Sequence, residues 1–121
     1  MNDPEVNMSQ QPGLTAHAIA LEAAGLALTL VMRVPAPLKS IADQVIRSAS
    51  SVPANIVEGH GRTGRDRSHH WRIAYASAKE VDSHLRLLLH AKAINPAQSG
   101  TALDLFDQTR AMLWRLLHPK P

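Results

Sequence analysis

The chain of 121 residues contains no cysteine and only four Phe, Trp or Tyr residues. The lack of cysteine excludes a disulfide scaffold, a thiolate zinc site, an iron–sulfur cluster and a cysteine nucleophile, and it favours the cytosol as the compartment. Because aromatic residues are so few, the core must be built from Ala, Leu, Ile and Val, which suits packed helices better than a β-sandwich. Plentiful, regularly spaced apolar residues also argue against disorder.

Other absences exclude most enzyme and cofactor classes. The segment 59–64, GHGRTG, lacks the Gly-Lys-Ser/Thr ending of a phosphate-binding loop. The histidines form no His-x3-His pair, and spacing identifies no Ser/His/Asp set. We therefore expect a protein that is not an enzyme and has no metal site or cofactor. The seven scattered histidines are His17, His60, His69, His70, His84, His90 and His118.

No stretch has the pattern of a secretory signal. Residues 1–13 are polar, lack a basic n-region and contain two prolines, which predicts a disordered leader. Segment 18–34 is the only transmembrane candidate, but it is short of the ~20 apolar residues that a spanning helix needs and contains Glu22 and Thr29. We expect a buried amphipathic helix there, and a cytoplasmic protein with no membrane partner.

Breaks at proline and glycine divide the chain into four segments that we expect to be helical, at about 14–33, 38–58, 63–95 and 101–118. Thr63 is the predicted N-cap of the third segment. Four amphipathic helices with short connections predict an all-α, antiparallel up-and-down four-helix bundle over residues 14–118, with 119–121 as a C-terminal tail.

Apolar residues in the last three segments recur every three or four positions, which is the period of a helix that packs on other helices. Pro53 lies inside the second stripe, where proline costs ~3 kcal/mol in a regular helix. Since the stripe keeps its phase across Pro53, we expect a kinked helix, with Ser50 and Ser51 hydroxyls bonded to freed backbone groups. The clearest stripe, in the third segment, consists of Trp71, Ala74, Ala78, Val81, Leu85 and Leu88.

Positive charge is concentrated in the third segment as a row of residues seven positions apart. A heptad step drifts only ~20° around a helix, so these side chains should form one basic stripe. Such a stripe fits the phosphates of RNA or DNA, with salt-dependent, sequence-independent affinity. The alternative is a solvated face with i,i+4 pairs such as Asp82–Arg86. The stripe consists of Arg65, Arg72, Lys79 and Arg86, and Arg62 and Arg67 add charge near its start.

Two blocks of sequence are similar to a known family. Residues 46–59, IRSASSVPANIVEG, resemble the signature of the four-helix-bundle proteins encoded in intervening sequences of 23S ribosomal RNA genes, a family that includes the accessory variability determinant of diversity-generating retroelements. Residues 72–80, RIAYASAKE, resemble a second block in the family's third helix, and Leu85 fits the leucine that follows. Arg67 and His70 stand where relatives carry an aromatic residue.

The resemblance implies a left-handed antiparallel four-helix bundle, a homopentamer and a binding role rather than catalysis. For the retroelement members it implies pairing with a reverse transcriptase and nucleic-acid binding through a basic surface. The rival hypothesis is a structural oligomer or protein-interaction module that does not bind nucleic acid. Leu87, Leu105 and Met112 are apolar positions that we expect a monomer to expose, which also favours an oligomer.

The polar residues of the two blocks form a second candidate site. We expect a buried ion pair or polar network between the second and third helices, which fixes their register while contributing little net stability. The alternative is a functional pocket with perturbed carboxylates. The residues concerned are Arg47, Asn55, Glu58, Ser77 and Glu80.

Overall fold

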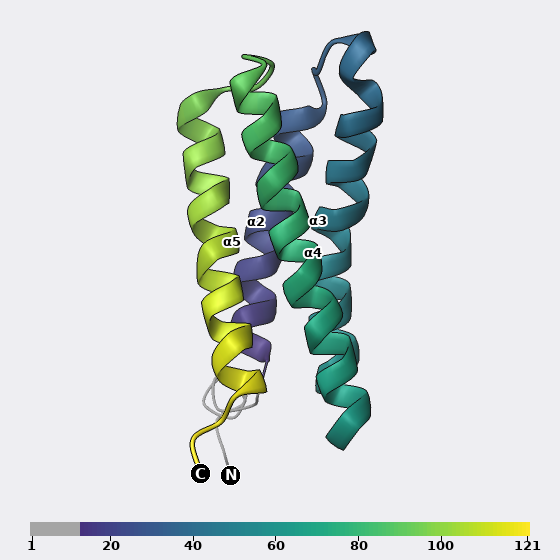
Figure 1. Ribbon diagram of the computed structural model, residues 1–121, viewed down its shortest axis with the longest axis vertical. Helices are drawn as coiled ribbons and strands as arrows, with labels where there is room; N and C mark the ends of the chain where they lie inside the picture. The colour runs from purple at the N-terminus through teal and green to yellow at the C-terminus, as the bar shows by residue number, and fades with distance from the viewer. Residues whose placement is uncertain (1–12) are drawn as a thin grey trace, which may run out of the picture.

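The computed structural model describes residues 13–121, which form four α-helices and one short 3-10 helix (Figure 1). No strand occurs in this part of the chain, so the prediction of an all-α four-helix bundle is confirmed. Of the predicted leader, residues 1–12 lie outside the described residues. The helices are α2 (Leu14–Val31), α3 (Lys39–His60), α4 (Gly64–His90) and α5 (Pro96–Leu117), and the 3-10 helix η1 (Ala36–Leu38) lies between α2 and α3.

The helices are arranged so that each packs against two others. Both α2 and α4 contact α3 and α5. In Figure 1, α4 lies in front, α2 lies behind it, and α3 and α5 stand on either side. The outer faces of α2 and α4 therefore point to opposite sides of the bundle.

The core is formed by the predicted stripes. All six stripe residues of α4 are buried, and Phe106, Leu113 and Thr109 of α5 are fully enclosed. The hydroxyl of Thr109 donates to the carbonyl of Leu105 at 2.8 Å, which satisfies a polar group that would otherwise be costly inside. The buried apolar residues of α3 are Ala42, Val45, Ala49, Val52 and Ile56.

Helix α2 differs from the prediction because it is not amphipathic. Its inner side is buried and made largely of alanine, but its outer side is apolar too, with Leu21 53% and Met32 79% exposed. By length and mean hydropathy (1.7) it could cross a membrane, a test that core helices also pass, and 39% of it is buried in the bundle. The buried alanines are Ala16, Ala20, Ala23, Ala24 and Ala27.

Helix α3 runs through Pro53 without a break, as predicted, and Pro53 itself is buried. The Ser50 hydroxyl donates to the carbonyls of Ile46 (2.7 Å) and Arg47 (3.2 Å), in the turn before the proline. We expected the Ser51 hydroxyl to bond to the backbone as well. It bonds instead to the side chains of Asn55 and of Ser77 on α4. The kink itself stays a prediction.

One predicted helix start is confirmed and another is wrong. Thr63 is the N-cap of α4, but its side chain makes no capping hydrogen bond. Helix α5 begins at Pro96 rather than near Thr101, because the Asn95 side chain accepts a hydrogen bond from the Gln98 amide at 2.9 Å. Proline suits the first helical position, where its missing N–H would have no partner in any case.

Candidate nucleic-acid interface

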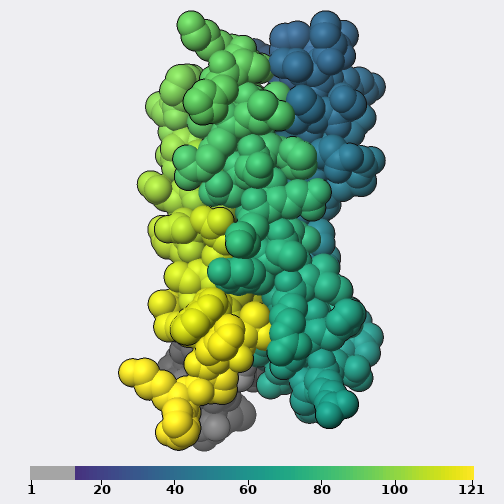
Figure 2. Space-filling model, viewed as in Figure 1, coloured from purple at the N-terminus to yellow at the C-terminus, as the bar shows by residue number. Residues whose placement is uncertain are grey.

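The predicted basic stripe lies on the outer face of α4. Arg65, Arg72, Lys79 and Arg86 are all exposed, and the buried stripe of the same helix faces the other way. Figure 2 views the bundle from this side, with α4 in front and α5 beside it. The geometry therefore presents four cationic side chains in a row to solvent.

Two of the predicted cations are engaged by carboxylates. Arg86 donates to Asp82 at 2.7 Å, and this hydrogen bond raises the pKa of Arg86 above its ordinary value. Arg62 contacts Glu58 at 2.6 Å, which raises the pKa of Arg62 and lowers that of the Glu58 carboxyl. The expected Asp82–Arg86 pair is thus formed, and part of the stripe is neutralised.

The centre of the stripe is different. Within residues 13–121, Arg65, Arg72 and Lys79 have neither a carboxylate partner nor a hydrogen-bonded one. Ammonium and guanidinium groups that protrude without a partner can bind phosphate oxygens without first breaking an ion pair. These three residues are the strongest phosphate-binding candidates, and we call them the free cations of α4.

A polar network joins α3 to α4, with a membership that differs from the prediction. The Ser77 hydroxyl of α4 is 2.9 Å from the Ser51 hydroxyl of α3, and the Asn55 amide donates to Ser51 at 3.0 Å. His70 Nδ1 lies 3.0 Å from Asn55 Oδ1, which extends the network along the helix interface. Asn55 and Ser77 are therefore brought together as expected, through Ser51.

The buried ion pair expected between these helices is not formed. Arg47 is exposed, Glu58 bonds to Arg62 at the end of its own helix, and Glu80 lies 3.7 Å from His84 on α4. Each carboxylate finds a partner on its own side of the helix pair, where water lowers the cost of its charge. Including Arg47, Glu58 and Glu80 in the network was wrong, and what remains is a small neutral network.

The glycine of the first sequence block has a packing role that the sequence did not reveal. A Cβ atom on Gly59 would lie 2.5 Å from the Trp71 ring, so only glycine lets the indole lie flat against α3. The Trp71 Nε1 group donates to the Ile56 carbonyl at 3.1 Å, and Arg67 donates to the carbonyls of Gly59 and His60. The signal available in the sequence was the pair of glycines in residues 58–61, EGHG, a short way before Trp71.

Arg67, at a position where the resemblance leads us to expect an aromatic residue, packs against an aromatic ring. Its guanidinium group lies 5.3 Å from the centre of the Trp71 ring, in a cation–π arrangement, while it caps the end of α3. Helix C-terminal carbonyls attract positive charge. Arg67 thus belongs to the α3–α4 junction and not to the stripe.

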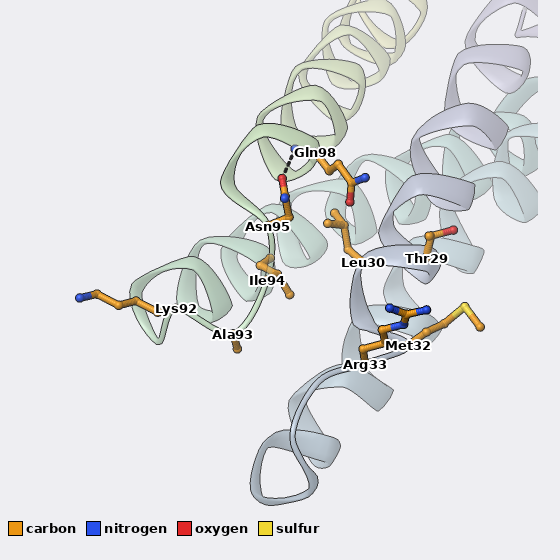
Figure 3. Close-up of a pocket in the computed structure, with 9 residues that line it drawn as sticks. All are labelled: Thr29, Leu30, Met32, Arg33, Lys92, Ala93, Ile94, Asn95 and Gln98. Atoms are coloured by element: carbon orange, nitrogen blue, oxygen red, sulfur yellow. Dashed lines mark hydrogen bonds between the residues drawn. The ribbon is translucent and has the colours of Figure 1, made fainter.

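The histidines of the described part of the chain do not gather into a metal-binding cluster, and another hollow lies apart from the basic stripe. Residues 13–121 contain no group of three or more His, Asp or Glu side chains placed to hold a metal ion. A hollow of about 720 Å³ at one end of the bundle is lined from α2 and the α4–α5 connection (Figure 3). Lys92 points away from it, and the Asn95 side chain is occupied in capping α5.

The fold and surface define a small four-helix-bundle protein with a cationic outer face on α4. Residues 19–115 match the family of 23S rRNA-intervening sequence proteins. Because this match covers most of the chain, the chain belongs to that family.

One solved structure supports the fold independently. It is the crystal structure of a protein of unknown function from the S23 ribosomal protein family of Bacteroides thetaiotaomicron. It has 23% sequence identity and a TM-score of 0.78, covering 88% of this chain and 97% of the other. At this identity the similarity shows the fold alone. No curated protein matches the chain.

Proposed function

We propose that the protein is a non-enzymatic, oligomeric nucleic-acid-binding protein that holds the RNA or DNA backbone on the outer face of α4. The observation that carries this proposal is the set of free cations of α4, which are exposed and lack carboxylate partners. Backbone phosphates are the ligands that such a row fits best, because their charges repeat along a line. The family's link to 23S rRNA genes agrees with an RNA partner.

The outer face of α2 supports the oligomeric part of the proposal. Ala18, Leu21, Gly25 and Met32 are exposed along it, and together with the partly buried Leu28 they follow a spacing of three and four residues, so they form a second apolar stripe. Although Glu22 and Thr29 are exposed beside it, a row of exposed apolar side chains of this kind is typical of a surface that another protein covers. We infer that a second copy covers this face, and the resemblance implies five copies.

The apolar stripe of α2 and the basic stripe of α4 lie on opposite sides of the bundle, so assembly and nucleic-acid binding are compatible. A ring in which the α2 face of one copy packs against α3 or α5 of the next leaves the stripe on α4 exposed in every subunit. Several stripes on one assembly would then bind one nucleic acid with a gain from multivalency. An accessory role beside a polymerase such as a reverse transcriptase, or on ribosomal RNA, would use this arrangement.

The three apolar positions that favour an oligomer in the sequence give less support to it in the structure. Leu87 is exposed, but Leu105 and Met112 are partly buried and pack against the core. The α2 outer face carries that inference instead. The same face would serve a structural oligomer or interaction module that does not bind nucleic acid, which remains the alternative.

Nucleic-acid binding is tested by a double substitution, Arg72→Gln with Lys79→Gln. For a backbone interaction, log K falls by ~0.7–0.9 per log unit of salt for each phosphate neutralised, so the slope should shrink by about two. The matched control, Arg33→Gln with Lys39→Gln, removes the same charge from exposed positions off α4 and should keep the slope. No binding by the natural chain at low salt, or equal loss in both variants, would refute the proposal.

The oligomer is tested by light scattering of the natural chain and of Leu21→Glu. We expect an oligomeric mass for the former and a smaller mass for the latter, because the substitution places a charge in the apolar stripe of α2. Gln108→Glu adds the same charge at an exposed position on α5 and should leave the mass unchanged. A monomer mass for the natural chain at micromolar concentration would contradict this part. Sizing the Arg72/Lys79 variant first separates lost binding from lost assembly.

A further inference from the structure

A cleft of about 450 Å³ runs between α4 and α5 on the same side of the bundle as the basic stripe. Figures 1 and 2 show the two helices side by side there. The stripe alone explains attraction to phosphate, but it leaves the aromatic groups of this cleft without a role. The cleft is lined by Tyr75 of α4 and by Asp107, Arg110, Ala111, Trp114 and Arg115 of α5.

Trp114 is the unusual member of this cleft. The residue is 51% exposed, whereas the other tryptophan, Trp71, is 4% exposed and hydrogen-bonded in the core. The Trp114 ring stacks on the His118 ring, with 4.2 Å between centroids and 21° between planes. The indole thus already holds one flat heterocycle in parallel, and much of its surface still faces water.

The cleft is bordered by cations on both helices. Tyr75 lies three residues after Arg72 and four before Lys79, so all three are neighbours on the surface of α4. Arg115 is exposed on the α5 side, and it has no carboxylate partner within residues 13–121.

The two carboxylates near the cleft are already engaged. Arg110 donates to Asp107 at 2.8 Å and reaches Asp82 at 3.5 Å, and Asp82 also accepts from Arg86. The acidic groups are therefore offset by arginines, and the net charge beside the aromatic rings is positive.

We propose that this cleft binds an unpaired base of a single-stranded nucleic acid, stacked on Trp114, while the neighbouring phosphates contact Arg72, Lys79 and Arg115. This inference rests on the proposed function and names its substrate class. Aromatic side chains beside a cationic track are typical of single-strand binding, since every base offers a flat face. A duplex keeps its bases stacked inside and gains nothing from an exposed indole.

A second copy of the chain is a poorer occupant of the cleft. If two copies met cleft to cleft, the cations of one would approach those of the other, and like charges brought together at an interface oppose association. Trp and Arg are also frequent in contacts with other proteins, so a protein partner is the outcome that the experiment must be able to detect.

The test compares two probes, a short oligothymidylate and a mixed-sequence duplex of equal length, on the full chain and on Trp114→Leu. Loss of one stacked base should weaken binding of the single strand by roughly 5- to 150-fold and leave duplex binding within about twofold. Trp114→Phe should restore most of the single-strand affinity, because phenylalanine keeps an aromatic face. Ile46→Ala removes an exposed apolar side chain of α3, outside both the cleft and the apolar stripe of α2, and should change neither affinity.

Tryptophan fluorescence gives an independent readout. The oligothymidylate should quench the natural chain, through Trp114, and leave the emission of Trp114→Phe, which reports only the buried Trp71, unchanged. Equal weakening of both probes, or single-strand binding without quenching, would overturn the base-binding cleft while leaving backbone binding intact. A change in assembly mass in Trp114→Leu with unchanged single-strand affinity would assign the indole to a protein contact. Absence of binding to either probe would refute both proposals.

Discussion

Replacement of Gly59 by alanine tests whether this glycine is needed for the close packing of Trp71 on α3. The new Cβ would lie 2.5 Å from Trp71 Cδ1 and 2.6 Å from Nε1, so the indole must move away from α3. Overpacking costs ~1–3 kcal/mol, and loss of the hydrogen bond to Ile56 would add ~1–3 kcal/mol. The higher helix propensity of alanine offsets at most ~1 kcal/mol of this loss in unfolding free energy. The net loss of unfolding free energy should therefore be about 1–5 kcal/mol.

The measurement is urea denaturation followed by circular dichroism at one fixed protein concentration, because assembly makes stability concentration-dependent. With ~1–3 kcal/mol per molar for the urea dependence, the midpoint should fall by at least about 0.3 M, and by about 1.5 M at the middle of both ranges. Gly100→Ala is the matched control, since a Cβ there meets nothing within 4 Å in the interior of α5. It should raise stability by ~0.5–1 kcal/mol. A rise in both variants would refute the proposed contact between Gly59 and Trp71.

Three further predictions concern α3 and its partners. Glu58→Gln should strengthen nucleic-acid binding at low salt and steepen its salt dependence, because it frees Arg62 and removes a negative charge, as a titration would show. The pKa of Glu58 in the folded chain lies below its ordinary value of 4.5, so the ion pair with Arg62 stabilises the fold above that pH. This stabilisation is lost as the pH falls through the lower, folded-state pKa. The stabilities of the natural chain and of Glu58→Gln, plotted against pH, should therefore converge in acid. Ser77→Ala removes one hydrogen bond to Ser51, and thermal unfolding should register a loss of ~1 kcal/mol.

The sequence predicted the bundle because apolar periodicity reports directly on which face of a helix is buried. Every stripe residue of α4 from Trp71 to Leu88 is inside, and the continuous phase across Pro53 correctly indicated one helix. Periodicity also placed the basic stripe, since residues that share a heptad position must share a face.

Which charged side chains pair with one another was harder to predict than where the helices lie in the chain. Glu58 and Glu80 were assigned to the interface between helices, but a local arginine or histidine reaches each of them at lower desolvation cost. The start of α5 was missed because Asn95 was interpreted as the end of the preceding segment and not as a cap. The aromatic cleft is lined by both Tyr75 and Trp114, and whether residues so far apart in the chain line one cleft depends on how α4 and α5 pack.

The alanine side of α2 has a consequence for how this protein can diverge. Five methyl groups determine how closely α2 approaches α3 and α5, so a larger side chain at any of them would push two helices outward at once. Neutral drift at these positions is confined to glycine, serine and alanine unless a neighbour shrinks in the same lineage. The exposed stripe on α4 has no such coupling, so Arg and Lys can exchange there one at a time. Related sequences should therefore vary less along the alanine side of α2 than along the stripe of α4.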